Sequence, residues 1–192
     1  MISFVYKEFE VKIMEKYMAN NHLRYLKGFR WFVIVLSAVL VLGGTLSVVG
    51  LLPNSIWRGL DHFLTKMTQI FGFAAVFLII FRMIWRLMKK SKIPNVRWIF
   101  SAWQFLKKRH VLFGWIVAAA GTAHSLYFLI FIPNDMNGVY SGLVAFAVMI
   151  VMVIFGYKLN LKERTSRNVR VLHTILGIAF IFGLLFHMGN LH

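Results

Sequence analysis

Five long runs of apolar residues restrict this chain more than any other feature of its sequence. Each is at least as long as the roughly 20 residues that a helix needs to cross a bilayer. Apolar residues make up 59% of the chain and only six residues are acidic, so a soluble domain of 192 residues would lack polar surface. The sequence therefore predicts an all-α, polytopic membrane helical bundle with five transmembrane helices, at residues 29–52, 68–88, 110–132, 138–159 and 169–190.

The N-terminal segment has a different pattern from the five runs. Residues 1–28 mix charged with apolar side chains and contain no continuous apolar stretch of the kind found in a signal peptide. We expect an amphipathic N-terminal helix on the cytoplasmic membrane surface, followed by one transmembrane bundle over residues 29–190. Residues 53–67, with Asp61, are expected to form a connection, and residues 89–109 an interfacial segment.

The distribution of lysine and arginine predicts the orientation. Of the 22 such residues, all but Arg58 and Lys66 lie in residues 1–30, in residues 82–109 or in residues 158–170. The positive-inside rule then places the N-terminus in the cytoplasm and the C-terminus outside. Because these charges flank the spans, the net charge of +16 indicates contact with anionic membrane lipid and not with nucleic acid. The compactness of the chain and the excess of lysine and arginine on one side of the membrane suit a protein of the bacterial plasma membrane.

Four histidines lie inside the apolar runs in a repeated pattern. His110 and His124 are fourteen residues apart in the third run. His173 and His187 have the same spacing in the fifth. Fourteen residues of helix span about 21 Å and return to nearly the same face. The third and fifth spans are predicted to be parallel. Each of two depths in the membrane would therefore hold a pair of histidines, one from each helix.

Such pairs are suited to the axial ligation of iron in two b-type haems, stacked one above the other. The chain has no cysteine, which excludes covalently attached c-type haem and thiolate metal sites. Gly114, Gly121, Gly177 and Gly183 lie about one turn from the histidines and would let a porphyrin approach the backbone. Phe180 lies midway between its two histidines and is expected to separate the haems.

Two arginines are candidates for binding haem propionates. Arg82 lies near the inner end of the second span, and Arg109 directly precedes His110. The alternative is that these side chains extend to the lipid headgroups, as arginine often does at the end of a span.

The parallel spans with paired histidines resemble the transmembrane domain of the ferric reductase and NADPH oxidase superfamily. The resemblance covers residues 29–190. It implies a di-haem cytochrome b that moves single electrons across a membrane, with His110, His124, His173 and His187 as haem ligands and Phe180 as the aromatic between the haems. The sequence lacks the sixth span and the C-terminal flavin- and NADPH-binding domain of that family. The donor is then a flavoprotein, a free reduced flavin or membrane quinol.

The expected function is electron transfer from a cytoplasmic or quinol donor to an extracytoplasmic acceptor, by a ferric reductase-like oxidoreductase or an electron-transfer subunit. A quinol-linked, superoxide-active cytochrome b is an alternative of the same class. A single histidine in a membrane helix more often makes a helix-to-helix hydrogen bond. A small metal or proton transporter and a non-catalytic scaffold therefore remain alternatives. The transporter is disfavoured because no Asp or Glu falls inside a predicted span.

Overall fold

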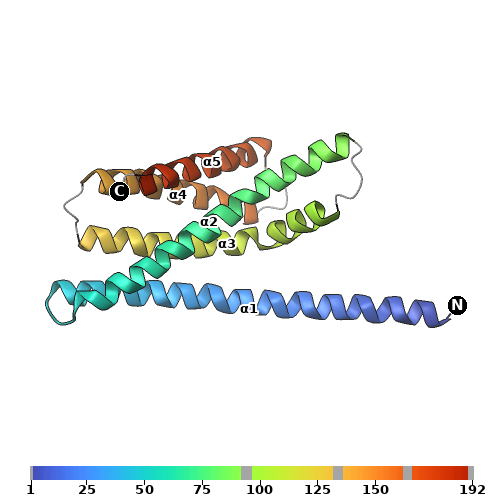
Figure 1. Ribbon diagram of the computed structural model, residues 1–192, viewed down its shortest axis with the longest axis horizontal. Coiled ribbons are helices and arrows are strands. Elements are labelled where there is room, and N and C mark those ends of the chain that lie inside the picture. The colour runs from blue at the N-terminus through green and yellow to red at the C-terminus, as the bar shows by residue number, and fades with distance from the viewer. Residues whose placement is uncertain (1, 92–96, 132–135, 162–165, 190–192) are drawn as a thin grey trace.

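The chain folds into five long helices. The computed structural model describes residues 2–91, 97–131, 136–161 and 166–189, and the side chains of 24–91, 98–131, 136–159 and 166–189. Within these ranges helix is the only regular structure (Figure 1). Each helix contains a stretch long and apolar enough to cross a membrane, which confirms the predicted all-α membrane bundle. The helices are α1 Ile2–Val48, α2 Asn54–Lys90, α3 Arg97–Ile130, α4 Met136–Leu161 and α5 Arg167–Gly189.

A tight turn separates α1 from α2. Gly50 has a φ of 77°, a conformation that costs glycine least because it has no Cβ. Its N–H donates to Ser47 O, and the N–H of Leu51 donates to Leu46 O, each with a nitrogen-to-oxygen distance of 3.0 Å. This pair of bonds is the Schellman arrangement that closes a helix. Pro53 then precedes α2, where its missing N–H costs nothing, so the chain reverses within a few residues.

Helices α2 to α5 form a four-membered ring. α2 contacts α3 and α5, and α4 contacts the same two helices. No described Cα of α3 lies within 8 Å of one in α5, and α2 and α4 are equally separate. α3 and α5 are therefore diagonal partners across the bundle. Successive helices run in opposite directions, so this diagonal pair is parallel, and α1 packs outside the ring against α2 and α3 (Figure 1).

Apolar side chains fill the contacts and also cover the outside. One buried cluster joins α1, α2 and α3 around Val33, Leu64 and Ile116, none of which has exposed surface. On the outer face of α5, Phe182 is 68% exposed and Phe186 is 66% exposed. Large apolar surface of this kind suits hydrocarbon and not water. The structure thus describes a multi-pass membrane protein in contact with lipid.

Three helices are longer than the sequence indicated. α1 continues without a break from Ile2, so the segment predicted as a separate N-terminal helix is collinear with the first span; the side chains of residues 1–23 lie outside the described set. α2 begins at Asn54, so residues 54–67 are helix and not a connection. α3 begins at Arg97 and includes residues 97–109, the larger part of the predicted interfacial segment. The physical reason is that Lys and Arg, which flank the apolar runs, are good helix formers and do not end a helix.

The alternating topology predicts which surface positions share a side of the membrane. The chain lacks cysteine, so single cysteines can be introduced at the exposed positions Ser55, Ser91 and Ser166. We expect Ser91→Cys and Ser166→Cys to react with a membrane-impermeant maleimide from one side of the bilayer, and Ser55→Cys from the other. The buried Ser37→Cys should react only after denaturation. Labelling of Ser55→Cys and Ser91→Cys from the same side would contradict this topology.

Candidate functional site

The four histidines meet in two pairs between α3 and α5. The ring centroids of His110 and His173 are 5.9 Å apart, with an interplanar angle of 83°. Those of His124 and His187 are 6.2 Å apart, at 67°. These are the two cross-helix pairs that the fourteen-residue spacing predicts. Because the helix backbones stay apart, the imidazoles bridge the interior of the bundle at two levels, here called the inner level, with His110, and the outer level, with His124.

The separation of each pair would allow both of its imidazoles to reach one metal ion. An imidazole nitrogen lies about 2.0 Å from a bound metal, and its ring centre lies about 1 Å further out. Two imidazoles on opposite sides of one metal ion would therefore have centroids about 6 Å apart. Both observed pairs agree with that value. In the described part of the chain, no three His, Cys, Asp or Glu side chains are grouped to hold a metal ion, so each level offers an imidazole pair and not a larger cluster.

Hydrogen bonds at Nδ1 hold both imidazoles of α5. The N–H of His173 Nδ1 donates to the Met152 carbonyl of α4, with a nitrogen-to-oxygen distance of 3.2 Å. Ser141 Oγ lies 3.1 Å from His187 Nδ1. The Ser141 hydroxyl donates to Gly138 O, so its oxygen is the acceptor for the His187 N–H. A neutral imidazole that donates from Nδ1 carries its lone pair on Nε2. Both α5 histidines therefore keep Nε2 available for a metal.

The two α3 histidines differ from each other. His124 Nδ1 lies 2.9 Å from Asp61 Oδ1 and 2.9 Å from Thr65 Oγ1, both on α2. The Asp61 side chain is only 5% exposed, and that of His124 is 21% exposed. His110 Nδ1 is buried and, among the described residues, has no hydrogen-bond partner. Among the described residues, the outer histidine of α3 is thus anchored by a carboxylate, and the inner one is not.

Two glycines of α4 accommodate the α5 rings. A Cβ on Gly142 would lie 3.0 Å from His187 Cε1, and a Cβ on Gly156 would lie 3.0 Å from His173 Cε1. Any larger residue would push the imidazole away, so the absence of a side chain sets the ring position. These glycines are themselves fourteen residues apart. The repeat that places the histidines therefore extends to α4.

A layer of apolar side chains separates the two levels. Val117, Met149 and Phe180 form one buried cluster contributed by α3, α4 and α5. Each lies seven residues from the histidines or glycines of both levels on its own helix. Phe180 is 4% exposed, and a Cβ on Gly72 of α2 would lie 3.5 Å from its ring. The structure thus places Phe180 between the levels and packed against three other helices.

The glycines expected to make room for porphyrins fall into two groups. A Cβ on Gly114 would meet nothing within 4 Å, and one on Gly177 only a sulfur at 3.9 Å, so the inner level has space beside both helices. A Cβ on Gly121 would lie 2.8 Å from Met149 Sδ. A Cβ on Gly183 would lie 3.5 Å from Ala145 of α4, which is an ordinary van der Waals contact. The outer glycines therefore serve helix packing, which is the more common role of glycine in membrane helices.

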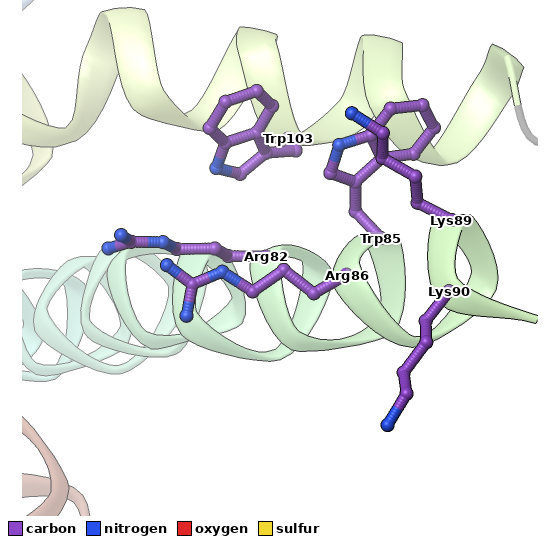
Figure 2. A pocket seen from close by; sticks show the side chains of 6 residues that line it. All are labelled: Arg82, Trp85, Arg86, Lys89, Lys90 and Trp103. Carbon is purple, nitrogen blue, oxygen red and sulfur yellow. The ribbon is translucent and has the colours of Figure 1, made fainter.

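The two candidate arginines lie in different surroundings. Arg109 Nε is buried and, in the part of the chain that the structure describes, has no hydrogen-bond partner; its guanidinium carbon lies 4.0 Å from the centre of the Phe105 ring. Arg109 is partly buried and directly precedes His110 in the sequence, so its buried donor would suit an anionic group at the inner level. Arg82 is exposed and lines an open hollow of about 590 Å³ between the ends of α2 and α3, where it points alongside Arg86 (Figure 2). The remaining lining residues are Trp85, Lys89, Lys90 and Trp103.

Sequence reasoning missed the polar support of the outer level. The sequence predicts that Asp61 lies in a connection, yet α2 includes it and buries it against His124. The premise that no carboxylate lies among the helices was therefore wrong. A signal was present: Asp61, Leu64, Thr68 and Gly72 are the buried residues of α2, at the three- and four-residue spacing of one helix face. The fourteen-residue spacing of Gly142 and Gly156 was equally visible in the sequence.

Comparisons with known proteins add no assignment. No family model, no curated protein and no solved structure matches the chain.

The close fit of the α4 glycines predicts a specific sensitivity. Gly142→Val and Gly156→Val should each displace the adjacent imidazole and lower the free energy of unfolding by about 1–3 kcal/mol, the usual cost of overpacking. Thermal unfolding in detergent measures the change. Gly59→Ala is the control, because a Cβ there meets nothing within 4 Å and alanine favours helix. Unaltered stability of both valine variants would show that the rings have room to move.

Proposed function

We propose that this chain is a transmembrane di-haem cytochrome b that carries electrons from a cytoplasmic or membrane-dissolved donor to an extracytoplasmic acceptor. The observation that carries the proposal is the pair of imidazoles at each of two levels, facing each other from diagonal helices. Cofactor sites in helical bundles are commonly built from side chains of facing helices in this way. Bound haem would supply reversible one-electron chemistry at each level.

The chain's own residues would hold each haem through Nε2. Histidines that ligate a metal usually donate their other N–H to a protein acceptor, which orients the ring. Three of the four histidines have a partner at Nδ1, namely a backbone carbonyl, a hydroxyl and a carboxylate. Arg109, whose buried Nε has no hydrogen-bond partner among the described residues, is suited to a propionate of the inner haem. Gly114 and Gly177 supply space at that level.

The positions of the charges support a direction for the proposed transfer. Most lysines and arginines lie at the end of the bundle nearest His110, which favours a cytoplasmic inner level and an extracytoplasmic C-terminus in a bacterial plasma membrane. The hollow with Arg82 and Trp103 opens at this same end, where a flavoprotein or quinol donor would arrive (Figure 2). Arg58 and Lys66 lie toward the other end and would attract an anionic ferric chelate. The proposed activity is thus ferric reductase-like.

The resemblance to the ferric reductase and NADPH oxidase superfamily supports the same proposal. That family also pairs histidines of parallel third and fifth helices and has an aromatic residue between its haems. Phe180, which is buried between the levels, would be the corresponding residue in this chain. A quinol-linked, superoxide-active cytochrome b would use the same ligands with a different donor and acceptor.

One observation favours a second candidate, a small histidine-based proton or metal transporter. The contact between Asp61 and His124 is a buried carboxylate–imidazole pair among membrane helices, and such pairs occur in proton pathways. This candidate does not account for the inner pair, in which His110 has neither a carboxylate nor another described hydrogen-bond partner at Nδ1. It predicts a colourless protein, whereas the cytochrome is red.

The first test is haem stoichiometry. Protein purified from cells supplied with ample haem should contain two haems b per chain, one for each imidazole pair, measured by pyridine haemochrome against protein concentration. Dithionite should produce the sharp α-band of low-spin, six-coordinate haem, as expected for two nitrogen ligands. Preparations that remain free of haem under these conditions would exclude the cytochrome and leave the transporter.

The second test asks whether the levels are independent. Each haem needs one histidine from α3 and one from α5. His124→Ala and His187→Ala should therefore lower haem content to about half and remove the same spectral component, while His110→Ala and His173→Ala remove the other. His22→Ala is the matched control, since it lies outside the apolar runs. If the two α3 variants lost one component and the two α5 variants the other, the cross-helix pairing would be wrong.

A further inference from the structure

The outer level differs from the inner level by one buried carboxylate. Asp61 Oδ1 lies 2.9 Å from His124 Nδ1, and its side chain is 5% exposed. The other described Nδ1 partners among the four histidines are uncharged: the Met152 carbonyl for His173 and the Ser141 hydroxyl for His187. His110 Nδ1 has no partner in the described chain. Within the described residues, His124 is therefore the only one of these four histidines that donates a hydrogen bond to a carboxylate.

A carboxylate acceptor changes an imidazole more than a neutral acceptor does. A hydrogen bond between Nδ1–H and a carboxylate draws the proton away from the ring and makes Nε2 a better electron donor. The effect is strongest where water is excluded, because the interaction is less screened there. The hydroxyl of Thr65, also 2.9 Å from His124 Nδ1, shares this N–H and holds the ring from a second direction.

We propose that Asp61 is a positioning residue that orients His124 and makes a haem bound at the outer level harder to reduce than a haem bound at the inner level. The inference rests on the proposed function, since it concerns the potential of a bound haem. Stronger donation from an axial ligand stabilises the ferric more than the ferrous state, which lowers the reduction potential. Asp61 would in this way set the outer level apart as the stronger reductant, on the side where the acceptor is expected.

The burial of Asp61 supports this role over that of a surface charge. α2 places it on the same face as Leu64, Thr68 and Gly72, all directed into the bundle. Leu64 has no exposed surface, and Thr68 is 8% exposed with its hydroxyl bonded to Leu64 O. In the described part of the chain, His124 is the only basic side chain that forms an ion pair with Asp61. The carboxylate is thus directed to a single imidazole.

The test is a redox titration of the haem-loaded protein carrying Asp61→Asn, followed optically. The amide keeps the shape of the side chain and can still accept through its oxygen, but it lacks the charge. We expect two haems per chain and an increase of one midpoint potential only. A tenfold change in the equilibrium constant for reduction corresponds to 59 mV for a one-electron couple. We expect the shift to reach about that size, and the ferric electron paramagnetic resonance signal of the same haem to change.

Two further variants separate charge from packing. Thr65→Val removes the hydroxyl but keeps the carboxylate, so it should shift the same potential by clearly less. If Asp61→Asn loses the outer haem, rebinding of that haem in Asp61→Glu with a near-native potential would support the positioning role; no rebinding in Asp61→Glu would overturn it.

The outcomes distinguish this inference from the function on which it rests. Two haems with unchanged potentials in Asp61→Asn, or an equal shift of both potentials, would overturn the role of Asp61 and leave the cytochrome standing. Wild-type protein without haem would overturn the cytochrome itself.

Discussion

The diagonal separation of α3 and α5 is the constraint on which the rest of the structure depends. Two neighbouring helices bury their side chains between their backbones and leave no room for a large planar group. α3 and α5 instead face each other across the bundle, and their imidazoles meet in the middle. α2 and α4 keep them at this distance by packing against both. The interior is thereby lined by four helices, and each can present a side chain to it at every level.

A period of fourteen residues organises that interior into layers. Fourteen residues are close to four helical turns, so residues at this spacing return to one face. The inner layer holds His110, His173 and Gly156, and the outer layer repeats it with His124, His187 and Gly142. Seven residues away on each helix, Val117, Met149 and Phe180 close the space between the layers. One repeat thus positions the imidazoles, the gaps that receive them and the apolar partition.

Polar side chains inside the bundle show why the two layers are not equivalent. A polar group among membrane helices is costly unless a partner satisfies it. Ser37, Thr68 and Ser141 donate to backbone carbonyls of their own helices. Asp61 instead depends on His124 of another helix. Among the described residues, this carboxylate is found at the outer layer and not at the inner one. It therefore introduces an electrostatic difference into an otherwise repeated arrangement.

The sequence by itself determined the class of fold and the pairing of the histidines. Apolar run length indicates helices in lipid, and the alternation of spans makes the third and fifth parallel, so the residues that share a level follow from helix geometry alone. Only the tertiary structure decided how long the helices are and what supports each ring. From its sequence context Asp61 is expected in a connection, because a charge near the end of a span ordinarily lies outside the bilayer. Its burial depends on α2 extending to Asn54 and on α3 offering an imidazole opposite it. The need for Gly142 and Gly156 likewise arises from contacts between helices, which no residue pattern within one helix contains.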